Sequence, residues 1–117
     1  MIKVYGIPNC GSVKKARALL ESMGVAYEFV DFKKTPPSRE ELTRWVQKTS
    51  LQILLNTKGT TYKKLGLKDR NLDDKQKFET MLEHPTLIKR PVIESSDTES
   101  SFTIVVGYDE ASLKALV

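Results

Sequence analysis

The amino-acid sequence predicts an α/β fold with a mixed four-stranded sheet. A strand, a helix and a second strand follow one another in residues 2–30, and such a unit is parallel with a right-handed crossover. Two further strands after Pro91, separated by a polar run, are typical of an antiparallel hairpin. We therefore expect a single domain over residues 1–117, with a helical insertion at residues 36–86 between its two parts.

The first strand–helix–strand unit is read from its hydrophobic spacing. A β-prone run at residues 2–5 is broken by the turn residues of GIPN. The apolar residues after this turn lie three and four apart, as on one face of a helix, and Gly24 is a suitable stop signal for that helix. Alternation over residues 25–30 then predicts the second strand.

The insertion contains two helices with clear start signals. Ser38–Glu41 matches the capping box, in which the serine and the glutamate satisfy backbone donors reciprocally. Asp73 opens another helix, which must close before Pro85. Between them, residues 54–67 form a less regular stretch with turn chemistry in its Asn-Thr-Lys-Gly segment.

The last third of the chain predicts two strands and a short helix. Val92 and Ile93 form the first strand, the polar run Ser95–Ser101 is expected to be the loop, and residues 102–106 alternate as the second strand. Asp109 can cap the last helix.

The overall composition narrows the functional class. The chain carries a net charge of +4, a sequence pI near 9.2 and a single cysteine. Its basic residues are not interspersed with aromatic residues as they are on nucleic-acid-binding surfaces, so we expect no direct binding of nucleic acid. No apolar run is long enough to span a membrane. An N-terminal signal peptide is not recognisable, and a lone thiol is best tolerated in a reducing compartment, so we expect a cytoplasmic protein. No set of metal ligands is recognisable in the sequence.

Cys10 is the candidate reactive group. It falls where the first helix begins, so unsatisfied backbone N–H groups and the helix dipole favour its thiolate. Gly11 and Ser12 are small and leave the sulfur open to an anionic co-substrate, while Lys14 and Lys15 add positive charge. The alternative is that Cys10 is a buried and inert residue. Asn9 is a candidate hydrogen-bond donor near the thiol or, equally, a helix cap.

Val13 limits the mechanism that Cys10 could use. A Cys-x-x-Cys centre would need sulfur at position 13, so an internal dithiol cycle cannot operate. Any turnover must therefore recruit a thiol from outside the chain.

Four motifs in order, GIPNCGSVKKA, TPPSREEL, LLNTKGTTYKKLGL and HPTLIKRPVI, resemble the arsenate reductase (ArsC) family that couples to glutathione and glutaredoxin. LLNTKGTT and IKRP are most similar to its YffB-type branch, and Spx-type regulators are relatives. The resemblance implies a thioredoxin-like fold with a helical insertion. It also implies a cis peptide bond before Pro91, with no tightly bound cofactor and with glutathione as the co-substrate.

The resemblance assigns roles to individual residues. Cys10 matches the nucleophile, and Arg90 matches an arginine that could hold an oxyanion or a carboxylate through two parallel hydrogen bonds. The alternative for Arg90 is a solvated charge that pairs with Glu94 or another acid. Lys58 is a candidate anion ligand, although an exposed turn lysine is the commoner case.

Two departures from the family pattern count against arsenate as the substrate. Asn56 and Gly107 stand where the reductases have arginines, and the nearby Lys58 offers charge without a planar fork. Two functions therefore remain: a glutathione-linked thiol reductase that uses Cys10, or an Spx-like module that contacts the RNA polymerase α subunit without a Cys-x-x-Cys switch.

Overall fold

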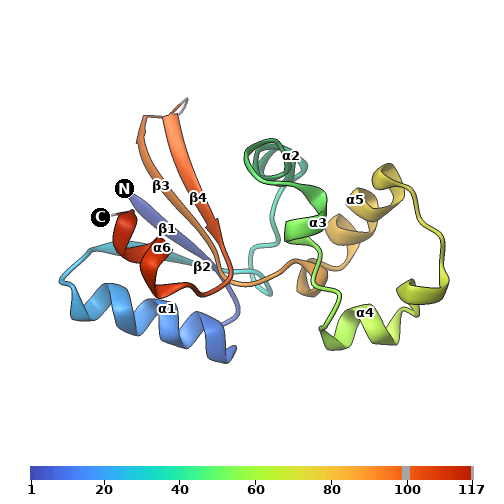
Figure 1. Cartoon of the computed structure of the whole chain (residues 1–117), viewed down its shortest axis with the longest axis horizontal. Coiled ribbons are helices and arrows are strands. Elements are labelled where there is room, and N and C mark those ends of the chain that lie inside the picture. Colours follow the sequence, from blue (N-terminus) through green and yellow to red (C-terminus); the bar gives the residue numbers. More distant parts are fainter. Residues whose placement is uncertain (99–100, 117) are drawn as a thin grey trace. The chain divides into compact units, whose positions relative to one another are not determined.

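The computed structural model describes residues 1–98 and 101–116, and they fall into two compact units. The first unit combines Met1–Thr35 with Arg90–Val117, and the second is Pro36–Lys89 (Figure 1). Within the described part of the chain, every helix is too short or too polar to cross a membrane.

The first unit is built on the mixed four-stranded sheet that the sequence predicts. Its strand order is β2-β1-β3-β4, with β1 and β2 parallel and the other two pairs antiparallel. Val4 in the central strand pairs with Phe29 on one side and with Ile93 on the other. The strands are β1 (Ile2–Gly6), β2 (Tyr27–Asp31), β3 (Val92–Thr98) and β4 (Ser101–Val106).

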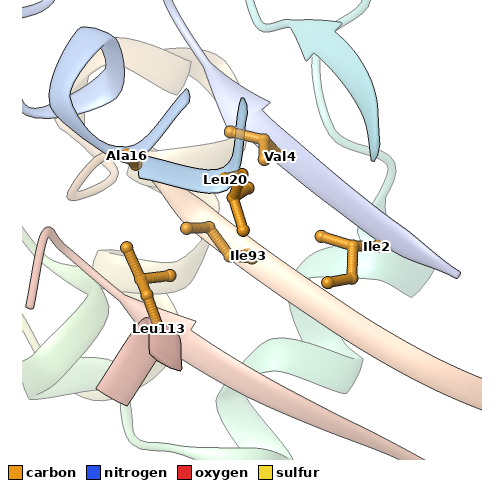
Figure 2. Close-up of a cluster of buried hydrophobic side chains, with 6 residues drawn as sticks. All are labelled: Ile2, Val4, Ala16, Leu20, Ile93 and Leu113. Carbon is orange, nitrogen blue, oxygen red and sulfur yellow. The ribbon is translucent and has the colours of Figure 1, made fainter. Parts of the chain in front are cut away.

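Two helices, α1 (Gly11–Ser22) and α6 (Glu110–Ala115), supply the apolar residues that pack against one face of this sheet. Figure 2 shows the resulting core, in which side chains from both helices meet those of β1 and β3. Each of these residues is at most 6% exposed, so this face of the sheet is dry. The cluster consists of Ile2, Val4, Ala16, Leu20, Ile93 and Leu113.

The end of α1 follows the prediction from Gly24. This residue has φ of 70°, its N–H donates to Glu21 O, and the N–H of Val25 donates to Leu20 O. These are the two hydrogen bonds of a Schellman motif, which needs a residue in the left-handed region at this position. The second strand starts two residues later than the alternation suggests, at Tyr27.

The second unit is mainly helical, with one isolated antiparallel bridge between Leu55 and Ile88. Both predicted helices are present with complete capping boxes, Ser38 with Glu41 and Asp73 with Gln76. Residues 54–67, expected to be less regular, contain one short helix, α4, and α3 ends at the first residue of this stretch; helices of about one turn need little amphipathic pattern. The elements are α2 (Arg39–Lys48), α3 (Leu51–Leu54), α4 (Thr60–Lys64), η1 (Leu67–Asp69), α5 (Asp74–Glu83) and η2 (Pro85–Leu87).

The polar loop predicted at Ser95–Ser101 is wrong over most of its length. β3 continues through Thr98 and β4 begins at Ser101, while residues 99–100 lie outside the described residues. The strand ladder is made by backbone groups, so it can extend into polar sequence where no apolar face is required. Asp109 does precede α6, but its carboxylate accepts from the Ser112 hydroxyl (2.6 Å) rather than capping the backbone.

Candidate functional site

Cys10 is the N-cap residue of α1, as its position in the sequence predicts. Its N–H donates to Ile7 O (3.1 Å), and its carbonyl accepts the first helical hydrogen bond, from Lys14 N (2.9 Å). These two bonds hold the residue in an extended conformation between β1 and α1, and its side chain is partly exposed.

Gly6 allows the strand to approach the first turn of α1 closely. Gly6 is buried, and a Cβ atom built on it would lie 2.6 Å from Cγ2 of Val13. Such a separation is shorter than van der Waals contact between carbon atoms. The helix that carries Cys10 is therefore set against β1 at a distance that only glycine permits without movement.

The pKa of the Cys10 thiol is lowered in the folded chain. Partial burial acts as the largest single effect and raises the pKa, but four opposing effects outweigh it. These are the backbone N–H of Val13, a hydrogen bond from the Arg90 side chain, the N–H of Ser12 and the charge of Arg90. Both N–H groups belong to the first turn of α1, where backbone donors lack helical partners and favour a thiolate.

Arg90 is distant from Cys10 in the sequence but belongs to the same unit, and it is followed by Pro91 and then by β3. Its guanidinium lies within hydrogen-bonding reach of the sulfur, its Nε is buried, and the Arg90–Pro91 peptide bond is cis, as the resemblance implied. Arg90, rather than Lys14 or Lys15, supplies the charge that lowers the thiol pKa; both lysines are exposed.

The other candidates around the thiol occupy the same loop and helix turn. Gly11 and Ser12 are the first two residues of α1 and are exposed, and a Cβ atom at Gly11 would meet open space. Asn9 is exposed in the turn before Cys10, and the structure records no capping hydrogen bond from a side chain at this helix start. The approach to the sulfur along Gly11 and Ser12 is thus unobstructed by large side chains of this turn.

Lys58 belongs to the second unit and lies on an exposed turn. Its N–H donates to the side-chain oxygen of Asn56 (3.3 Å), and both residues line a surface hollow of about 250 Å³ together with Lys89. Gly107 has φ of 84°, and its N–H donates to Pro91 O (2.8 Å). An arginine at position 107 would be strained in this backbone conformation. The glycine that replaces the family arginine therefore also suits the conformation of the main chain at this position.

The group that sequence reasoning missed is the N–H of Val13. Its apolar side chain marks it as a core residue, and it is indeed fully buried. Its position three residues after the N-cap is the available signal, because the N–H of this residue points back toward the capping side chain. Within the described residues, no three or more His, Cys, Asp or Glu side chains are grouped as metal ligands.

Known proteins share this sequence and this arrangement. The ArsC family model matches residues 5–116. An arsenate reductase from Neisseria meningitidis serogroup A is 35% identical over 95 residues, which cover 79% of this chain and 81% of that protein.

Two solved structures superimpose over nearly the whole chain. A protein named YFFB has a TM-score of 0.87 and 37% identity, covering 99% of this chain and 98% of its own. An arsenate reductase from Vibrio cholerae has a TM-score of 0.81 and 29% identity, with coverage of 99% and 97%. The thioredoxin-like fold is therefore confirmed, and this chain belongs to the ArsC family of arsenate reductase-like proteins.

Proposed function

We propose that this protein is a glutathione-dependent thiol reductase in which Cys10 acts as a lone thiolate nucleophile. The observation that carries the proposal is the lowered pKa of Cys10 between the first turn of α1 and Arg90. A lower pKa raises the fraction of thiolate at neutral pH, and the thiolate is the nucleophilic form. The lone thiol also suits a reducing compartment, which supports a cytoplasmic location.

The proposed substrate is a mixed disulfide between glutathione and another thiol. The Cys10 thiolate attacks the glutathione sulfur, the disulfide bond breaks, and the substrate leaves as its thiolate. A second glutathione thiolate then attacks the Cys10–glutathione disulfide, which releases oxidised glutathione and restores the Cys10 thiolate. The net exchange converts the mixed disulfide and one reduced glutathione into the free substrate thiol and oxidised glutathione, so the cycle needs no second cysteine in the chain. Glutaredoxin could replace the second glutathione in this last step by the same exchange.

Arg90 has two roles in this proposal. It stabilises the Cys10 thiolate, and its planar fork can bind a glutathione carboxylate by parallel hydrogen bonds. Ser12 and Gly11 offer backbone donors and space at the helix start, and Asn9 an amide beside it.

Arsenate is not the substrate that this site favours. Family reductases hold the oxyanion with several arginines, whereas this chain has Asn56 and Gly107 at two of those positions. Gly107 cannot be exchanged for arginine without backbone strain, because its φ is 84°. Within the described residues, Arg90 is the guanidinium that acts on the thiol, and one guanidinium is better matched to one carboxylate than to a multiply charged oxyanion.

The test is intact-protein mass spectrometry after incubation with oxidised glutathione, together with the rate of thiol alkylation as a function of pH. We expect one glutathione adduct on wild type, reversed by reduced glutathione, and none on Cys10→Ser. The midpoint of the alkylation rate against pH should lie below 9.0, the ordinary pKa of a cysteine thiol. A thiol that stays unmodified and titrates at its ordinary value would refute the proposal.

A further inference from the structure

The second unit contains a pocket whose lining includes none of the residues around Cys10. Its volume is about 170 Å³, and all of its lining residues lie in Pro36–Lys89. The apolar part of its wall comes from four leucines on separate segments. Leu67 and Leu87 are buried, and Leu55 and Leu72 are half-buried.

Two cations line the same pocket. Arg70 precedes α5, and Lys77 lies on α5 with a half-buried side chain. Among the residues that the structure describes, neither forms an ion pair, although an exposed Arg39–Glu79 pair is present on the same unit (2.6 Å). The pocket therefore has positive charge that the described chain does not neutralise.

Neutral hydrogen-bonding groups complete the lining. Tyr62 of α4, Thr57 of the turn before it and Gln52 of α3 also line the pocket. Thr80 also lines it, with its hydroxyl donating to Gln76 O (2.6 Å). A few polar groups around an apolar wall are the usual composition of small-molecule sites.

The volume restricts the ligand to a small molecule. A cavity of about 150 Å³ in another protein holds one benzene ring, so this pocket has room for a ring or a short branched chain and one polar group. The lone cations select an anionic polar group, and a carboxylate is the form that arginine and lysine can both bind.

We propose that this pocket is a second binding site, for a small aromatic or branched-chain carboxylate. The ring or chain lies against the leucines, and the carboxylate faces Lys77 and Arg70. The proposal is independent of the reductase activity, since no residue of the Cys10 site lines the pocket. Its failure and the failure of the proposed function can therefore be distinguished.

The experiment is an amide NMR titration of the full-length, isotope-labelled protein with sodium benzoate, with benzyl alcohol as the neutral comparator. We expect benzoate to shift the amides of Leu55, Tyr62, Thr80 and Leu87 with a Kd on the order of 1 mM, the range for so small a ligand. Benzyl alcohol should bind more weakly at the same amides.

Two variants test the charge and the volume. Lys77→Met keeps the apolar stem and removes the cation, and we expect it to weaken benzoate about threefold to fivefold. Lys75→Met is the matched control, because Lys75 lies on the same helix but does not line the pocket. Thr80→Leu places extra carbon in the pocket and should abolish the shifts, with an unchanged spectrum elsewhere showing that the unit still folds.

Three results would overturn the proposal. Shifts confined to amides near Cys10 and Arg90 would show that benzoate binds as a simple anion at the thiol. Equal affinity for benzyl alcohol would show that the carboxylate contributes nothing to binding. An unchanged affinity in Thr80→Leu, together with a folded spectrum, would show that the ligand lies elsewhere.

Discussion

Replacing Gly6 with alanine tests how tightly β1 and the first turn of α1 are packed. The new methyl carbon would lie 2.6 Å from Cγ2 and 3.5 Å from Cγ1 of Val13, a side chain with 0% exposure. Alanine gains about 0.5–1 kcal/mol over glycine from the lower entropy of the unfolded chain, and at most about 0.8 kcal/mol from burying a methyl group.

The overlap opposes this gain. Overpacking a core costs about 1–3 kcal/mol, and the upper part of that range applies because Val13 is β-branched and cannot easily rotate away. We therefore expect Gly6→Ala to lower the free energy of unfolding by about 1–2 kcal/mol. Val13→Ala alone should cost about 2–3 kcal/mol, since it removes two buried methyl groups and leaves a small cavity.

The double variant separates the close contact from other causes. In Gly6→Ala with Val13→Ala, the new methyl group occupies part of the vacated space, so the pair should be less destabilised than the sum by about 1–2 kcal/mol. The measurement is urea unfolding of the four proteins, followed by far-ultraviolet circular dichroism. Effects that add to within about 0.5 kcal/mol would refute the reasoning, because independent sites behave in that way.

Three further results are expected. Arg90→Gln should raise the pKa of the Cys10 thiol, because it removes a hydrogen bond and a positive charge, and would move the alkylation profile to higher pH; an unmoved profile would contradict the assignment. The lowered pKa of Cys10 should also make the stability depend on pH. The unfolding free energy of wild type relative to Cys10→Ser should increase as the pH rises from the folded pKa toward 9.0, and this gain should be lost when the pH falls through the folded pKa. Denaturation at several pH values measures this difference. Gly24→Ala should cost about 1 kcal/mol in urea unfolding because its φ is 70°, whereas Gly11→Ala, in open space at the helix start, should cost nothing.

The elements that the sequence predicts well are those with local causes. The capping box at Ser38 and the stop at Gly24 each depend on residues within one helical turn, so their hydrogen bonds follow from neighbours in the chain. The parallel pairing of β1 with β2 and the antiparallel pairing of β3 with β4 follow from the crossover and from the hairpin pattern, whereas the pairing of β1 with β3 was not predicted.

The features that the sequence does not predict depend on distant residues or on the main chain. α3 and α4 have four and five residues, too few to display a helical period. The polar residues of β3 pair through their backbone, which their side chains do not reveal. At the candidate site, Val13 acts through its N–H, and the second pocket assembles side chains from several short segments that no single motif connects.

The polar half of the hairpin has a consequence for the unfolded chain. β4 is an edge strand, and its sequence, SFTIVV, is uncharged and rich in β-prone residues. Such a segment can template intermolecular pairing when a nascent or denatured chain exposes it. The serines and acids that precede it in SSDTES, and Asp109 and Glu110 after it, flank the segment as gatekeepers against aggregation.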